Sequence, residues 1–392
     1  MTTAAIAILE RLVAFDTISA KSNLDLVGWV ADYLDGHGVE SALTRNPEGT
    51  KANLFATIGP GDRGGVILSG HTDVVPVEGQ AWHSDPFRLE TRQADHGSDR
   101  LYGRGTADMK GFIALVLAMV PQALAQPLEI PLHLAFSYDE EVGCLGVPDL
   151  IRGLPKDAAR PRLAIIGEPT EMQVANAHKG IHFLRTRVTG HEAHSSTPEH
   201  GVNAIAAAAE IIAEIGRVAG ECRAAAKPDG VFDPPYTSFN IGRIAGGAAV
   251  NIIARDCAFE WEFRPVPGED GAALQRLIDD FVNAELLPRM RAGHPEADVE
   301  TRTMARVPPL APDPASPAEA LARRLTGANT TTTIAFATEA GLFQAAGIPA
   351  VICGPGSIDV AHQPNEFISR EQLAAGEAFL SGLLAWARRG GS

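Results

Sequence analysis

Histidines and carboxylates follow the short apolar runs of this sequence, at the points where we expect strands to end. The residues concerned are His71, Asp73, Asp108, Glu140, Glu141, Glu168 and His362. Open α/β sheets bind their ligands in the crevice beyond the carboxyl ends of their strands. Each of these residues, taken alone, could simply cap a turn or a helix. Five separate segments that all carry such residues are better explained by one shared site.

Histidine and carboxylate ligands without cysteine suit Zn²⁺ or a similar divalent ion. Two imidazoles and several carboxylates are more than one open tetrahedral site needs, and they suffice for two metals that share a bridging carboxylate. Two ions about 3.5–4 Å apart activate a water molecule and polarise a carbonyl group. One carboxylate must then remain unligated, as the base that takes the proton of the water. The residue types therefore predict a hydrolytic dimetal site.

Three local patterns suggest other kinds of site. Gly103 and Gly105 resemble part of a dinucleotide-binding fingerprint, but the third glycine is misplaced. Residues 139–141 are consecutive acids, which commonly form a solvated loop. His191 and His194 resemble an HExxH motif that is one residue short, so we reject a third metal there. A non-catalytic protein that captures an amino-acid derivative in the same cleft is a further alternative, but such a protein would be expected to have lost the base or a ligand.

Strands alternate with helices in the first part of the chain, and again from about residue 330 onward. Residues 66–68, 131–136 and 163–166 are apolar runs typical of buried strands, and residues 113–120 are expected to be helical. This alternation predicts an α/β fold with a mixed, mostly parallel sheet flanked by helices.

The middle of the chain has a different pattern. The strands and helices expected there are 182–188, 202–218, 238–244, 257–263 and 274–287. A block of this kind can bury a core of its own. We therefore predict two domains, one formed by residues 1–176 and 295–392, and the other an α+β domain inserted at 177–294.

Charge and composition restrict the class of protein. The 392 residues include 33 basic and 48 acidic side chains, which gives a formal charge of −15, and 45% of the residues are hydrophobic. This is a globular composition, and its negative charge argues against a nucleic-acid partner. The four cysteines show no CxxC spacing, which is typical of a reducing compartment. We find neither a signal peptide nor a run of about 18 apolar residues, so we expect a cytoplasmic protein without a membrane partner.

Five motifs, read in order, resemble those of a known enzyme family. They are SGHTDVVP, LYGRGTADMKG, YDEEVGCLG, IIGEPTEM and AHQPNEF. Together they span nearly the whole chain and look like the ordered motifs of the M20 co-catalytic metallopeptidases and amidohydrolases. Within that family, AHKG, PPYTSFNIGRIAGG and GPGSIDVAHQP resemble the acetylornithine deacetylase branch more closely than the succinyl-diaminopimelate desuccinylase or aminoacylase branches.

The resemblance implies a zinc-exopeptidase-like catalytic domain and a role for each residue of the site. One Zn²⁺ would be held by His71, Asp108 and Glu168, and the other by Asp108, Glu141 and His362. Asp108 would thus bridge two Zn²⁺ ions per subunit, for which Co²⁺ could substitute. Glu140 would be the general base and later the general acid, and Asp73 would orient His71.

The resemblance also implies that the inserted domain is a lid and dimerisation domain. His194 would reach the active site of the second subunit of a homodimer and steady the tetrahedral oxyanion. Asn251 and Arg264 would hold the substrate, with Arg264 forming a bidentate fork to its α-carboxylate.

The implied reaction removes the N-acetyl group from N2-acetyl-L-ornithine, giving L-ornithine and acetate in arginine biosynthesis. The partner would therefore be a small-molecule N-acyl amino acid. N-acetylcitrulline, N-succinyl-diaminopimelate or a dipeptide are alternative substrates within the same family.

Overall fold

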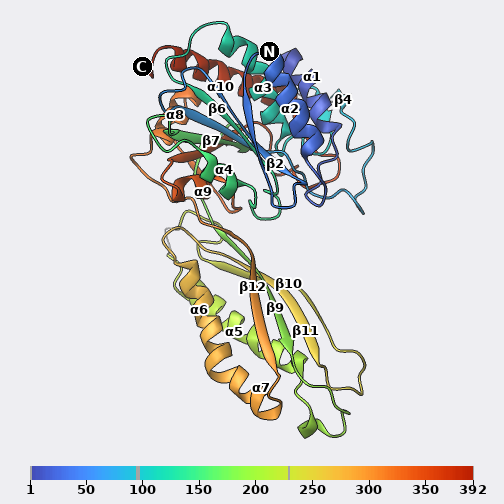
Figure 1. Cartoon of the computed structure of the whole chain (residues 1–392). Helices are drawn as coiled ribbons and strands as arrows, with labels where there is room; N and C mark the ends of the chain where they lie inside the picture. The colour runs from blue at the N-terminus through green and yellow to red at the C-terminus, as the bar shows by residue number, and fades with distance from the viewer. Residues whose placement is uncertain (1, 94–97, 228–229, 392) are drawn as a thin grey trace. The chain divides into compact units, whose positions relative to one another are not determined.

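The computed structural model describes residues 2–93, 98–227 and 230–391. The chain divides into two compact units (Figure 1). The first unit holds the chain up to Ala177, together with Pro312–Thr333 and the stretch from Thr338 onward. The second unit holds His178–Ala311 and Ile334–Ala337.

The first unit is built on an eight-stranded sheet with the strand order β1-β2-β6-β3-β7-β14-β8-β13. The strands are β1 (Ser41–Arg45), β2 (Ala52–Ile58), β3 (Val66–His71), β6 (Leu132–Ser137), β7 (Leu163–Pro169), β8 (Ala175–His178), β13 (Thr332–Ile334) and β14 (Ala350–Gly354). The central strands β6, β3, β7 and β14 pair in parallel, whereas β1, β2 and β6 pair antiparallel. Every residue of the four central strands is buried, because helices cover both faces.

The helices of the first unit lie on both sides of this sheet. They are α1 (Thr2–Val13), α2 (Leu24–Gly36), α3 (Lys110–Leu124), α4 (Val147–Gly153), α8 (Pro317–Thr326), α9 (Ala340–Ala345) and α10 (Arg370–Arg388). Figure 1 shows α1, α3 and α10 on one side and α4 and α9 on the other. Helix α3 packs closely on β7 at Gly167. A Cβ atom at this position would lie only 2.1 Å from the ring of Phe112, so a larger residue would not fit. The predicted α/β fold with a mostly parallel sheet is confirmed.

A small sheet lies at the edge of the first unit, with the order β15-β5-β4. Its strands are β4 (Glu90–Arg92), β5 (Arg100–Tyr102) and β15 (Phe367–Ser369). Strand β5 leads into the loop before α3, and β15 follows the loop that carries His362. Pairing of β5 with β15 therefore brings together two loops that are distant in the sequence.

The second unit is a four-stranded antiparallel sheet with helices on one face (Figure 1). Its elements are β9 (Ile181–Thr189), η1 (Pro198–His200), α5 (Ala204–Ala224), β10 (Ser238–Gly246), β11 (Asp256–Arg264), α6 (Gly271–Phe281), η2 (Val282–Leu286), α7 (Leu287–Gly293) and β12 (Asp298–Val307). Burial alternates along β9 and β11, and the inward side chains, Trp261 among them, form a core with α5 that is separate from the core of the first unit.

The second unit extends further along the chain than the expected 177–294. Strand β12 pairs with β9, and the unit runs to Ala311. The sequence signal of β12 is weak because polar side chains occupy most of its positions, and only Ala305 and Val307 within it are buried. At the other end, the unit begins at His178, one residue after the expected start.

Candidate metal centre

The sheet of the first unit places the candidate ligands at one edge. His71 is the last residue of β3, Glu168 lies near the end of β7, and Glu141 follows β6. These strands are parallel neighbours in the order β6-β3-β7, so their carboxyl ends meet. Asp108 comes from the loop before α3, and His362 from the loop between β14 and β15.

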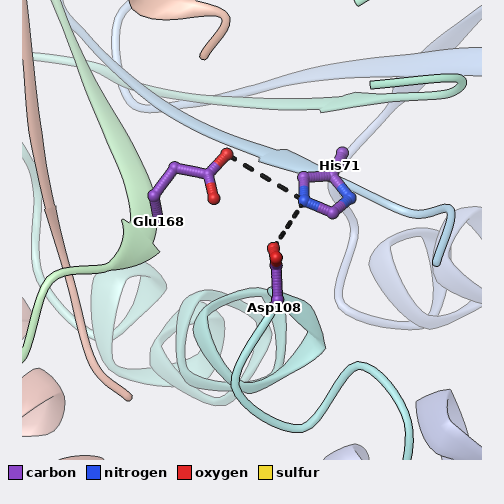
Figure 2. Close-up of side chains that lie close together, drawn as sticks. All are labelled: His71, Asp108 and Glu168. Carbon is purple, nitrogen blue, oxygen red and sulfur yellow. Dashed lines mark hydrogen bonds and ion pairs between the residues drawn. The ribbon is translucent and has the colours of Figure 1, made fainter. Parts of the chain in front are cut away.

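The first group of ligands consists of His71, Asp108 and Glu168, all buried (Figure 2). The Nε2 atom of His71 lies 2.9 Å from Oδ1 of Asp108 and 3.9 Å from Oε1 of Glu168. The Nδ1 atom of the same ring lies 2.9 Å from the main-chain oxygen of Asp73. A carbonyl oxygen only accepts, so Nδ1 carries a proton and donates it. The Nε2 atom is thereby turned toward both carboxylates, as in a histidine that ligates a metal.

The second group consists of Asp108, Glu141 and His362. The Nε2 atom of His362 lies 3.2 Å from Oδ2 of Asp108 and 3.0 Å from Oε2 of Glu141. The two oxygens of Asp108 thus face different histidines, Oδ1 toward His71 and Oδ2 toward His362. This is the arrangement that a bridging carboxylate requires.

The charges of this cluster are unbalanced without cations. Burial, reinforced by Asp108, raises the pKa of Glu141 to about 7. Burial also raises the pKa of Glu168 well above its usual range, again with help from neighbouring carboxylates. Contacts with Asp108 and Glu141 raise the pKa of His362 to about 10. Several acids crowded into one buried site repel one another unless positive charge lies between them.

Two unsatisfied oxygens support the same interpretation. Among the described residues, Oε1 of Glu141 and Oε1 of Glu168 are buried and have no hydrogen-bond partner. An unpaired buried carboxylate oxygen is costly, and coordination to a cation is one of the few ways to satisfy it. The donor set is nitrogen and oxygen without sulfur, which suits Zn²⁺. The residues therefore fit a pair of divalent cations.

Glu140 belongs to neither ligand group. Its Oε1 atom accepts a hydrogen bond from the thiol of Cys144 over 3.3 Å. Burial raises the pKa of Glu140 well above its usual range, opposed by His71 and reinforced by the carboxylates around it. A carboxylate with a raised pKa, beside the ligands but outside both groups, can accept a proton and return it. The sequence offered no signal for the contact with Cys144 beyond its four-residue spacing.

Asp73 accepts hydrogen bonds from several residues, whereas the resemblance implies a contact with His71 alone. Its main-chain oxygen accepts a hydrogen bond from Nδ1–H of His71, and its carboxylate lies 3.7 Å from that ring. The same carboxylate accepts a hydrogen bond from the hydroxyl of Ser19 over 2.7 Å. It also accepts the backbone N–H groups of Glu140 and Glu141 at 3.1 Å and 3.3 Å. Asp73 therefore orients His71 and the following acidic segment together.

Two further buried carboxylates near the site were missed by the sequence reasoning. Glu339 accepts hydrogen bonds from the hydroxyls of Ser69, at 2.7 Å, and Ser137, and so links β3 to β6. Glu366 accepts four donors and forms a buried ion pair with Arg104. Glu366 lies inside the AHQPNEF motif, which was the available signal; Glu339 lies in no motif that we singled out.

The remaining predicted residues lie in the second unit. The Nδ1 atom of His194 lies 2.7 Å from the hydroxyl of Ser196. The exposed Asn251 is close to it in the fold, because its main-chain oxygen accepts the N–H of Ser195 over 3.0 Å. The guanidinium of Arg264 forms a fork to Glu262, with contacts of 3.1 Å and 3.3 Å. Each residue is thus held within this unit by its own local contacts.

No third ligand group occurs in the part of the chain that the structure describes. The ring of His191 instead stacks on that of His294, with 3.9 Å between the ring centres. The same described residues include no helix with the length and apolar content needed to cross a bilayer.

The sequence matches the family described as peptidase family M20/M25/M40 over residues 67–386, a range that includes every candidate ligand. The chain belongs to this family. Acetylornithine deacetylase of Proteus mirabilis (strain HI4320) is 36% identical, with 93% of this chain and 91% of the relative covered. The enzyme of the same name from Pasteurella multocida (strain Pm70) is 34% identical, with 96% of each covered.

Solved structures of M20 proteins share this fold. An M20 family metallo-carboxypeptidase from Sulfolobus solfataricus has a TM-score of 0.74 at 17% identity, with 97% of this chain and 98% of that chain covered. A dinuclear metal-binding M20 peptidase from Bacillus subtilis has a TM-score of 0.64 at 15% identity, with 99% of each chain covered. At such low identities the likeness is one of fold. Membership of the family identifies the chain as a metal-dependent hydrolase that acts on small molecules.

Proposed function

We propose that this M20 hydrolase is an acetylornithine deacetylase, which hydrolyses N2-acetyl-L-ornithine to L-ornithine and acetate in arginine biosynthesis. The main support for a hydrolytic metal centre is the position of Asp108, because one of its oxygens faces His71 and the other faces His362. The identity of 34% and 36% to two acetylornithine deacetylases over nearly the whole chain supports the substrate.

The two ligand groups would hold the cations. His71, Asp108 and Glu168 would hold one divalent ion, and Asp108, Glu141 and His362 the other. We propose Zn²⁺ at both positions, with Co²⁺ as a substitute, because the donors are imidazole and carboxylate. When bound, such a pair supplies Lewis acidity toward the acyl carbonyl and lowers the pKa of a water molecule.

Glu140 would move the proton. Its carboxylate takes a proton from the attacking water, whose oxygen forms the new bond to the acetyl carbon. When the carbon–nitrogen bond breaks, Glu140 returns that proton to the leaving amine. The acetic acid formed gives up its remaining proton to the free amine, so the products are acetate and the ammonium form of the amino acid. A raised pKa suits both halves of this cycle, and Asp73 keeps the backbone of Glu140 in place.

The second unit would complete the substrate site as a lid and dimerisation domain. Arg264 would exchange its fork to Glu262 for one to the substrate α-carboxylate, and Asn251 would bind nearby. His194 would act on the oxyanion from the second protomer of a homodimer. We also propose a cytoplasmic location, which the four free cysteines support.

The substrate proposal is tested with a panel of amides. The metal-loaded protein is assayed with N-acetylornithine, N-acetylcitrulline, N-succinyl-diaminopimelate, N-acetylmethionine and a dipeptide, in the presence of Zn²⁺ or Co²⁺. We expect the highest kcat/KM for N-acetylornithine. A higher value for the succinylated compound or the dipeptide overturns the proposed substrate but leaves the hydrolytic centre intact, whereas inactivity toward every amide contradicts both.

A further inference from the structure

Glu366 is a fully buried carboxylate with four hydrogen-bond donors. Its Oε1 atom accepts the backbone N–H groups of Ala107 at 2.8 Å and Asp108 at 3.1 Å. Its Oε2 atom accepts the N–H of Gly105 at 2.9 Å and the guanidinium of Arg104 at 2.7 Å. All four donors belong to one loop, which carries Asp108 shortly before α3 begins.

Glu366 itself belongs to the other loop of the second ligand group. It lies four residues after His362 and directly before β15. Its main-chain oxygen accepts the N–H of Gly103 over 3.0 Å, so backbone and side chain both bind the same loop. One residue therefore fastens the loop of Asp108 to the loop of His362.

The loop of His362 needs such support. His362 and Asn365 both have φ near 62°, in the left-handed region that residues with a side chain rarely adopt. The side chain of His362 is also 48% exposed, so packing alone does not hold it. By contrast, His71 and Glu168 of the first group lie on buried central strands, where the sheet fixes their positions.

Arg104 links Glu366 to His362 by a second route, through Gln80. Its Nη2 atom donates to the amide oxygen of Gln80 over 2.6 Å, and Nε2 of Gln80 donates to the main-chain oxygen of His362 over 2.9 Å. Arg104 is only 1% exposed and lies over the ring of Trp82. Two routes therefore connect this buried ion pair to His362. Glu366 is joined to it by the chain, four residues away, and Arg104 is joined to it through Gln80.

We propose that Glu366 is a positioning residue that sets the spacing of Asp108 and His362 and thereby the affinity of the second metal position. The inference rests on the proposed dimetal centre. A hydrogen-bonded partner behind a ligand typically contributes about 10–100-fold to metal affinity. The effect should be larger on the second group than on the first. The second group takes both Asp108 and His362 from the two loops that Glu366 joins, whereas the first takes only Asp108 from them and its other ligands lie on strands.

The test is Glu366→Gln, which keeps the size of the side chain. One acceptor oxygen becomes an NH₂ group that faces two donors, so two of the four contacts are lost. The metal-free protein is titrated with Co²⁺, and the two binding steps are followed by calorimetry and by the visible absorption of the ion. We expect the second dissociation constant to rise by about tenfold or more while the first changes by less than about threefold.

Glu339→Gln is the matched control. It removes the same charge from another buried carboxylate near the site, but the donors there are the hydroxyls of Ser69 and Ser137. A hydroxyl can rotate and accept from the new amide, so both contacts can survive. We expect the second dissociation constant of this variant to stay within about threefold of the wild-type value.

Three results overturn the assignment. They are a second dissociation constant in Glu366→Gln equal to that of the wild type, equal weakening of both steps, or equal weakening in Glu339→Gln. If Glu366→Gln does not fold, Glu366→Asp replaces it. This variant keeps the carboxylate but cannot reach all four donors, and an unchanged second step again overturns the proposal. A wild-type chain that binds fewer than two ions contradicts the dimetal centre itself, which is a separate result.

Discussion

At the residue scale, the neighbouring acids Glu140 and Glu141 have different surroundings. The carboxylate of Glu141 faces His362 at 3.0 Å and belongs to a ligand group. The carboxylate of Glu140 contacts the thiol of Cys144 and belongs to neither group. Glu140 begins a turn in which its main-chain oxygen accepts the N–H groups of Gly143 and Cys144. Because the two side chains meet different partners at this turn, two adjacent acids can perform two tasks. This division makes the pair a sharp test of the proposed chemistry.

Glu140→Gln is expected to keep both metal ions and to lose at least about 10²–10⁴-fold in kcat, because an amide cannot accept a proton. Glu141→Gln, the matched neighbour, should instead weaken metal binding, because it removes a ligand oxygen. Metal content and kcat are measured for both variants in parallel. Near wild-type turnover of Glu140→Gln would contradict the role given to this residue.

The sequence indicated the seven candidate residues of the centre but not the buried contacts behind them. His71, Asp108 and the other ligands could be predicted because each follows an apolar run or lies in a recognisable motif. The contacts of Glu339 and Glu366 could not be predicted, because their partners lie up to 270 residues away in the sequence and only the packing of the whole fold brings them together. For the same reason the hydrogen bonds of the Asp73 carboxylate to Ser19 and to the acidic segment could not be predicted, in addition to the expected role of Asp73 beside His71.

At the scale of elements, β6 carries a buried histidine that is not part of the site. His133 is 2% exposed and stacks on Phe55. Its Nε2 atom accepts the N–H of Gly65 over 3.2 Å, and its Nδ1 atom lies 2.9 Å from the hydroxyl of Thr57. The ring must be neutral to accept the bond from Gly65. Accordingly, burial lowers the pKa of His133 to about 4.

This histidine should make the fold sensitive to acid. The unfolded chain binds a proton at His133 near pH 6.5, whereas the folded chain does so only near pH 4. The unfolded state therefore holds more protons in this window, and stability is lost as the pH falls through it. We expect the wild type to lose about 2 kcal/mol more than His133→Gln between pH 7 and pH 5. Urea unfolding of both metal-free proteins at the two pH values measures the difference, and equal losses would contradict the prediction.

The elements themselves were largely predictable, and the exceptions have physical causes. Strands β3, β6 and β7 are rich in apolar residues because helices cover both faces of their sheet. Strand β12 carries only a weak apolar signal, because it lies at the edge of the second sheet and is mostly exposed. The expected end of the inserted domain, residue 294, therefore lies before β12, a strand that is recognised only by its pairing with β9.

At the scale of the whole molecule, the formal charge of −15 is partly concentrated in one site of the first unit. Asp73, Asp108, Glu140, Glu141 and Glu168 gather there, together with two histidines. Two divalent cations would add four positive charges at this point and relieve the repulsion. The second unit has no comparable group among its described residues. Metal should therefore stabilise one unit and leave the other unaffected.

Removal of metal with a chelator is expected to destabilise the first unit selectively. At a free Zn²⁺ concentration about 100 times the dissociation constant, binding adds about 2.7 kcal/mol to the free energy of unfolding. Hydrogen exchange with and without Zn²⁺ should show added protection in β3, β7 and the loop of His362, and no change in β9 and β11. Equal protection in both units, or none in either, would contradict a metal centre confined to the first unit.

The most direct test of the central claim is the number of metal ions bound per chain in the wild type and in Asp108→Ala. Both are dialysed against the same free Zn²⁺ concentration, and metal content is measured by elemental analysis, with Glu168→Ala as a control that removes a ligand from one group only. We predict two ions per wild-type chain, about one in Glu168→Ala and fewer than one in Asp108→Ala, because Asp108 belongs to both groups. A wild type with a single ion, or an Asp108→Ala variant that still holds two, would contradict the shared-ligand centre.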